Sequence, residues 1–231
     1  MKSKVFHKRE LLNIKLNIMI AGLILFFGVT SIFVSAMSHI NENFLFEFRY
    51  MTLNGTVFTT LISLITLILS VIQLRRGVNY ESTKLYYLRL SSAVTEGIIA
   101  TVILMSFFPS VPDNPNIFTY DSFCMHVLIP LLAVTSFLLN KSPVAYMSPL
   151  STLNCAWLIT LYAIVVISMI LGGVIPDEKI PYSFLNFNTQ PIYYIFYFGV
   201  FIYSFAYVLS FLFAHINRKM AGLWQNPINS E

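Results

Sequence analysis

Six long apolar segments dominate this chain and limit the folds that are open to it. A bilayer core about 30 Å thick needs roughly 20 apolar residues per helix. Only 10% of the residues are charged and the mean hydropathy is +0.73, whereas soluble domains carry about 25% charged residues. The chain is therefore predicted to be an all-α, polytopic integral membrane protein with six transmembrane helices. The predicted spans cover residues 16–37, 51–74, 90–108, 124–140, 153–175 and 191–214.

The charged residues between these segments divide by sign, with most basic residues on one side of the predicted membrane and most acidic residues on the other. Twelve of the 14 Lys and Arg residues lie before span one, between spans two and three, after span four or after span six. Arg49 and Lys179 lie on the opposite side, together with six acidic residues. The positive-inside rule then places both termini in the cytoplasm. The net charge of +4 is explained by this orientation, so we expect no nucleic-acid partner. We expect one helical domain over residues 1–231.

Two polar residues open two of the spans on the same predicted outer side. Thr52 begins span two and His126 begins span four. An ionisable residue inside a span is by default a functional hypothesis, and a helix N-terminus favours the neutral imidazole that a general base requires. A neutral His that removes a hydroxyl proton makes that hydroxyl a nucleophile. The structural alternatives are a capping or back-bonded Thr52 and an interfacial His126 bonded to a neighbouring helix.

Pro130 distinguishes the helix that carries His126. It lies four residues after the His and has no N–H to donate to the His126 carbonyl, so we expect a bend or a freed acceptor beside the ring. The sequence does not decide whether Thr52 and His126 touch, because spans two and four need not be neighbours.

Arg49 and Asp121 are candidates to support such a site from the outer loops. Arg49 precedes Thr52 by three residues and suits either a lipid carboxylate or phosphate, or an anchor at the headgroups. Asp121 precedes His126 by five residues and is either the third member of a triad or an exposed loop carboxylate.

Amide and phenol groups give further candidates near the same face. Asn54 and Asn186 are possible donors to an oxyanion. Tyr182 belongs to a tyrosine-rich last third of the chain, whose hydroxyls either line a polar cavity or pack with satisfied hydrogen bonds.

Glu96 is the carboxylate that lies well inside a span, nearer the cytoplasmic face. An ionised Glu at this depth is costly unless it is paired or protonated. We interpret Glu96 as a hydrogen-bonding partner of another helix or a tether for Arg89. The alternative is a proton-relay acid of the kind found in transporters.

Motifs of several other chemistries do not occur in the sequence. It has no Gly-rich phosphate loop, no His-Glu-x-x-His, no Gly-x-Ser-x-Gly and no run of spaced metal ligands. Cys124 and Cys155 start spans four and five on opposite sides, which predicts neither a disulfide nor a zinc site. We therefore expect no cofactor and no metal.

The segments around Thr52 and His126 resemble a known family. Phe48–Thr52 and His126–Pro130 are similar to the androgen-induced and androgen-dependent membrane proteins, and more closely to their bacterial six-span relatives. Leu88–Leu90 with Glu96, and Ile180–Asn186, also fit the bacterial branch. The similarity runs from about residue 10 to about residue 218.

The resemblance implies a function and a location. Animal members of the family are intramembrane threonine hydrolases that cleave fatty-acid esters of hydroxy fatty acids, and their Thr and His correspond to Thr52 and His126. The bacterial branch implies the cytoplasmic membrane of a bacterium. One departure is the pair Ser136-Phe137, which stands where the bacterial pattern has an acidic-aromatic pair.

Three classes of function follow from these observations. The first is a lipid-ester hydrolase with Thr52 as nucleophile and His126 as general base, acting on a membrane lipid or fatty-acid ester. The second is a non-catalytic binder or transporter of lipids or small molecules, lined by Glu96 and the Tyr-rich last span. The third is a structural subunit, for which Gly172-Gly173 is the one small-residue hint. Substrate identity and oligomeric state do not follow from the sequence.

Overall fold

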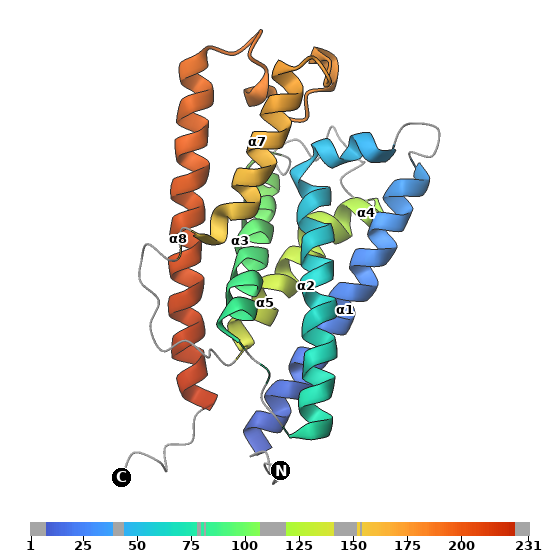
Figure 1. The fold of residues 1–231 in the computed structure, drawn as a ribbon, viewed down its shortest axis with the longest axis vertical. Coiled ribbons are helices and arrows are strands. Elements are labelled where there is room, and N and C mark those ends of the chain that lie inside the picture. The colour runs from blue at the N-terminus through green and yellow to red at the C-terminus, as the bar shows by residue number, and fades with distance from the viewer. Residues whose placement is uncertain are drawn as a thin grey trace.

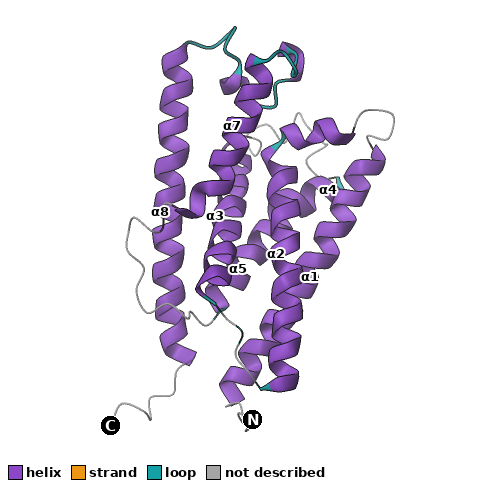
Figure 2. Cartoon of the chain, viewed as in Figure 1, coloured by secondary structure: helices purple, strands orange, loops and turns teal. Residues whose placement is uncertain are grey.

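The computed structural model of the chain describes residues 8–38, 44–77, 80, 82–106, 119–140, 152 and 154–224. Nearly all of these residues are helical, and no β-strand occurs among them (Figure 2). Six helices are long and apolar enough to cross a membrane. The prediction of an all-α, multi-pass integral membrane protein is thereby confirmed.

Four of the six membrane-length helices are single, the fourth is assembled from three consecutive pieces and the fifth from two. The start of α1 and the end of α8 lie at the same end of the bundle (Figure 1), as an even number of spans requires. The single helices are α1 (Lys8–Ser38), α2 (Met51–Arg76), α3 (Thr83–Ser106) and α8 (Ile192–Trp224), and the fifth joins the 3-10 turn η5 (Asn154–Ala156) to α7 (Trp157–Leu171). The fourth comprises α4 (Tyr120–Phe123), the π-helix η4 (Cys124–Leu128) and α5 (Ile129–Leu139). Short 3-10 turns are η1 (Phe44–Arg49), η5 (Asn154–Ala156), η6 (Asp177–Lys179) and η7 (Ser183–Leu185).

Helix α3 forms the centre of the bundle. Two thirds of its membrane window is buried (67%), against 11% for α8. It packs against α2, α5 and α8, and its residues Tyr86, Leu90 and Val94 belong to the main hydrophobic core. The large apolar side chains that α8 exposes are those expected of a helix that faces lipid.

The start of α3 differs from the predicted span in a way that changes the role of one residue. The helix begins at Thr83, not at residue 90, so that Arg89 lies inside it and is 5% exposed. Its Nη2 donates to Asn17 Oδ1 at 2.9 Å, to the Ser136 carbonyl at 2.7 Å and to Ser136 Oγ at 3.0 Å. Arg89 is therefore a buried cross-link between three helices, and not one of the loop cations that it was expected to be.

Other helix ends also differ from the predicted limits. Helix α1 begins at Lys8 and α8 continues to Trp224, while α7 covers only Trp157–Leu171. Gly172 and Gly173 end α7, and Gly173 has a left-handed φ of 70°, which glycine adopts without strain. The glycine pair thus terminates a helix at this point in the fold.

Helices α1 and α2 approach each other closely at Gly28. A Cβ atom at this position would lie 2.0 Å from Thr60 Oγ1 and 3.1 Å from Thr60 Cβ. The two helices run together over much of their length (Figure 1). The missing side chain of Gly28 is therefore what allows this contact.

Candidate active site

The two residues that open spans two and four are in direct contact. Thr52 Oγ1 lies 3.2 Å from His126 Nε2, although the residues are 74 positions apart in the chain. Thr52 is the second residue of α2 and His126 is the central residue of η4. Both side chains are half-buried. The geometry is that of a hydroxyl beside its proton acceptor.

The other ring nitrogen of His126 defines the tautomer. Nδ1 lies 2.8 Å from the carbonyl oxygen of Ser122 and 3.2 Å from Ser122 Oγ. A carbonyl oxygen only accepts hydrogen bonds, so Nδ1 carries a hydrogen. In the neutral ring Nε2 is then the acceptor, and the Thr52 hydroxyl donates to it. Sequence reasoning missed this role of Ser122, although its i−4 spacing from His126 was the available signal.

The π turn around His126 has a local cause in the sequence. The Ile129 N–H donates to the Cys124 carbonyl, five residues back. Pro130 cannot donate to the His126 carbonyl, and its ring would clash with that carbonyl in an ordinary α-helical turn. Widening the turn by one residue relieves this clash, and such π turns are frequent at functional sites. Pro130 thereby affects the direction in which the imidazole projects.

Two tyrosines from distant segments meet the first turn of α2. The Met51 N–H donates to Tyr182 Oη at 3.2 Å, and Tyr162 Oη donates to the Arg49 carbonyl at 2.5 Å. The side chains of Thr52 and Tyr162 both lie close enough to the Tyr182 hydroxyl to affect its pKa. Burial raises the pKa of Tyr182, so that the phenol keeps its proton. Tyr162 carried no sequence signal, because it lies in mid-span among apolar residues.

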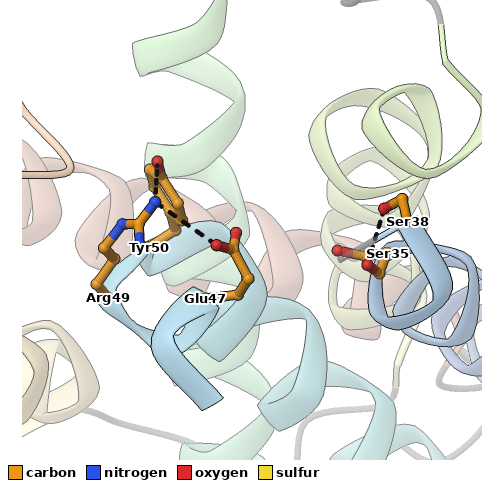
Figure 3. A network of polar contacts seen from close by, with 5 residues as sticks. All are labelled: Ser35, Ser38, Glu47, Arg49 and Tyr50. Carbon is orange, nitrogen blue, oxygen red and sulfur yellow. Dashed lines mark hydrogen bonds and ion pairs between the residues drawn. The ribbon is translucent and has the colours of Figure 1, made fainter. Parts of the chain in front are cut away.

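Arg49 is packed between aromatic rings rather than presented to solvent. Its guanidinium carbon lies 4.4 Å from the Phe46 ring centroid and 4.6 Å from that of Tyr50. Nη2 donates to Tyr50 Oη at 2.9 Å and lies 3.5 Å from Glu47 Oε1. Figure 3 shows Glu47, Arg49 and Tyr50 together with a separate contact at the end of α1, where Ser38 Oγ donates to the Ser35 carbonyl. These contacts anchor the segment that leads into α2.

Asn54 holds the junction between η1 and α2. Its Nδ2 donates to the Phe48 carbonyl at 2.7 Å and to the Tyr50 carbonyl at 2.8 Å. Both amide hydrogens are therefore engaged with the backbone, two residues from Thr52. The residue fixes the chain direction at the start of α2, and its amide is not directed at an incoming ligand.

The remaining outer candidates lie beside the site without contacting its reactive atoms. Asp121 is half-buried in α4, and Nδ1 of His126 donates its hydrogen bond to the carbonyl oxygen of the neighbouring residue, Ser122. Asn186 Oδ1 accepts the backbone N–H groups of Asn188 and Thr189 at 3.0 and 3.2 Å. Asn186 thus shapes the loop between α7 and α8.

Glu96 belongs to a separate polar cluster deeper in the bundle. It is fully buried, and its Oε1 accepts the Thr59 hydroxyl at 2.8 Å, while Thr59 also contacts Ser92 Oγ at 2.8 Å. Glu96 Oε2 is buried and has no hydrogen-bond partner within the described part of the chain. Thr59 and Ser92 also line a polar cavity of about 10 Å³ beside Arg89. That volume holds about one water molecule.

The outer surface next to His126 is apolar. Phe123 and Val127 flank the ring on the same helix and are each 45% exposed. Side chains of this kind at a membrane span contact acyl chains. The Thr52–His126 pair therefore lies beside a surface suited to lipid, at the same end of the bundle as the start of α2.

The described residues do not form a metal site or a disulfide. They contain no group of three His, Cys, Asp or Glu side chains that could hold a metal ion. Cys124 and Cys155 are both buried free thiols.

Comparisons of the chain with protein-family models, with curated proteins and with solved structures find no match.

Proposed function

We propose that this protein is an intramembrane lipid-ester hydrolase that uses Thr52 as nucleophile and His126 as general base. The observation that carries the proposal is the 3.2 Å contact between Thr52 Oγ1 and His126 Nε2, with the opposite nitrogen bonded to the Ser122 carbonyl. A hydroxyl, a base and a group that orients the base are the parts of an activated nucleophile. The resemblance of the surrounding segments to intramembrane threonine hydrolases supports the same chemistry.

The first half-reaction transfers the acyl group to Thr52. Oγ1 attacks the ester carbonyl carbon while Nε2 takes the hydroxyl proton, and the carbonyl electron pair moves to oxygen. The tetrahedral oxyanion collapses, the bond to the leaving alcohol breaks, and the imidazolium returns the proton to the alcohol oxygen. The Ser122 carbonyl stabilises the imidazolium by accepting from Nδ1.

The second half-reaction regenerates the hydroxyl. His126 takes a proton from water as the water oxygen attacks the acyl carbon. The bond to Oγ1 then breaks, and Oγ1 recovers its proton from Nε2 while the fatty acid leaves. The charge distribution supports placing this site at the outer face of a bacterial cytoplasmic membrane, where loop water and lipid both reach it.

The apolar surroundings support a substrate that enters from the bilayer. Phe123 and Val127 present their side chains beside the imidazole, so an acyl chain can lie along the helix while its ester reaches Oγ1. We therefore propose a membrane lipid or fatty-acid ester as substrate.

The test is covalent labelling of the purified protein in detergent micelles with an alkyl fluorophosphonate. Thr52 Oγ1 displaces fluoride at phosphorus, and peptide mass spectrometry locates the adduct. We expect wild type to label at Thr52 and Thr52→Ala to lose labelling. His126→Ala should label about 10²–10⁴ times more slowly, the usual contribution of a general base.

Two matched variants control for unspecific effects. Thr101→Ala removes a hydroxyl that bonds only its own helix, at the Gly97 carbonyl. His215→Ala removes an exposed imidazole stacked on Phe211. Both should label like wild type. A folded wild-type protein that does not label, or a Thr52→Ala variant that labels at the same rate, would refute the hydrolase.

A further inference from the structure

The segment between α7 and α8 brings a phenol to the proposed nucleophile. Tyr182 lies in this segment just before η7, and its hydroxyl accepts the Met51 N–H at 3.2 Å. Thr52 is the next residue along the chain, and its side chain is close enough to the same hydroxyl to affect the pKa of Tyr182. The site is thus formed by three segments that are far apart in the chain: the start of α2, η4 and the loop before α8.

The hydrogen of the Tyr182 hydroxyl is available to a further acceptor. Because the oxygen accepts from an amide, the phenol's own hydrogen points elsewhere. Tyr162, the neighbouring phenol, donates its own hydrogen to the Arg49 carbonyl and therefore does not donate it to Tyr182. The O–H of Tyr182 can therefore rotate and donate a hydrogen bond to a ligand bound beside Thr52.

The ring of Tyr182 is held firmly enough to aim this donor. It stacks on Phe184 with ring centroids 5.3 Å apart and an interplanar angle of 15°. Phe184 stacks in turn on Phe198 of α8 at 3.7 Å. A preorganised donor costs little reorganisation when charge develops, and this is the property that an oxyanion site needs.

We propose that the Tyr182 hydroxyl donates a hydrogen bond to the oxyanion that forms when Thr52 attacks an acyl carbonyl. The inference rests on the proposed function and adds a catalytic residue to it. The oxyanion forms on a carbon bonded to Oγ1, and therefore within reach of groups that line Oγ1. Tyr182 keeps its proton throughout, since the oxyanion collapses by expelling the alcohol.

The start of α2 supplies a second donor in the same place. Thr52 is the second residue of the helix, so its backbone N–H has no acceptor within α2. The Met51 N–H is taken by Tyr182, so the Thr52 N–H is the next backbone donor at the start of the helix, and in serine hydrolases the N–H of the nucleophile donates to the oxyanion. The positive end of the helix dipole adds to the stabilisation of the negative charge.

The test compares the rate constant of fluorophosphonate labelling at Thr52 between wild type and Tyr182→Phe in detergent micelles. Loss of one oxyanion donor typically costs about 10²–10³ in rate, so we expect a decrease of that size. Tyr193→Phe is the matched control, because Tyr193 is 61% exposed at the start of α8 and its ring contacts that of Tyr197. It should label like wild type.

A second variant separates an oxyanion donor from a helix cap. Replacing Tyr182 by 3-fluorotyrosine makes the phenol a stronger hydrogen-bond donor and a weaker acceptor. An oxyanion donor then keeps or raises the labelling rate, whereas a residue that only caps the Met51 N–H lowers both the labelling rate and the unfolding temperature.

The possible outcomes distinguish the two proposals. Wild type that labels at Thr52 together with a Tyr182→Phe variant of equal rate would overturn the role of Tyr182 and leave the hydrolase intact. A slow 3-fluorotyrosine variant with reduced thermal stability would also overturn it, in favour of the cap. Wild type that fails to label at Thr52 would refute the hydrolase itself.

Discussion

Replacement of Pro130 by Ala separates the stability of the fourth span from the geometry of the site. The alanine N–H can donate to the His126 carbonyl, and the clash of the proline ring with that carbonyl disappears. We expect the π turn at Cys124–Leu128 to become an α-helical turn. A residue contributes about 100° of rotation in an α-helix, so closing the π turn rotates the imidazole by a large part of that angle and moves Nε2 away from Thr52.

The two effects of Pro130→Ala have opposite signs. A proline in a helix interior is less favourable than Ala by about 3 kcal/mol. Pro130 is buried, and the loss of two methylene groups costs about 0.8 kcal/mol each. The free energy of unfolding should therefore rise by about 1 kcal/mol. Labelling of Thr52 should slow by about 10²–10⁴, because the nucleophile loses its base.

The assay measures thermal unfolding in detergent and the rate constant of fluorophosphonate labelling on the same preparation. Leu131→Ala is the control, because this neighbouring side chain is 63% exposed and its loss should change neither quantity much. Wild-type labelling by Pro130→Ala would show that the π turn does not position His126. A parallel decrease in stability and labelling would show that Pro130 acts only through packing.

Two further substitutions test the packing and the support of the site. Gly28→Ala should lower the free energy of unfolding by about 1–3 kcal/mol through overpacking, since its Cβ would lie 2.0 Å from Thr60 Oγ1. Gly22→Ala, in open space on the same helix, should raise it by about 0.5–1 kcal/mol, and equal thermal shifts in the two variants would contradict this account. Asn54→Ala removes two hydrogen bonds of 2.7 and 2.8 Å and should cost about 1–3 kcal/mol. The same change should slow labelling of Thr52, and an unchanged rate would show that the start of α2 is held without it.

The spans were predictable because a segment must be long and apolar enough to cross the bilayer as a helix. Each apolar segment had to form a helix that satisfies its own backbone, and the six membrane-length helices follow from that requirement. The ends were less predictable. Arg89 reads as a loop cation in the sequence, yet Asn17 and Ser136 satisfy its guanidinium inside the bundle, and the charge of Arg89 alone did not predict these partners.

The contacts within the site depend on helix packing, which the sequence does not state. Thr52 and His126 were singled out by their positions at the outer helix ends, but their contact requires α2 to lie beside η4. That arrangement depends on close approaches such as Gly28 against Thr60. Tyr162 was missed because a tyrosine in mid-span is ordinarily a packing residue.

The hydrogen bonding of α2 explains why the hydroxyl of Thr52, unlike those of Thr60 and Thr66, is available as a nucleophile. Thr60 and Thr66 donate to the carbonyls four residues back, at 2.7 and 2.8 Å, and such back-bonded hydroxyls are already satisfied. The carbonyl four residues before Thr52 belongs to Phe48, which lies outside α2 and accepts the Asn54 side chain. The Thr52 hydroxyl therefore turns to the imidazole. Within a bilayer, interrupted helices are where polar groups remain available for chemistry, and both halves of this pair lie at such interruptions.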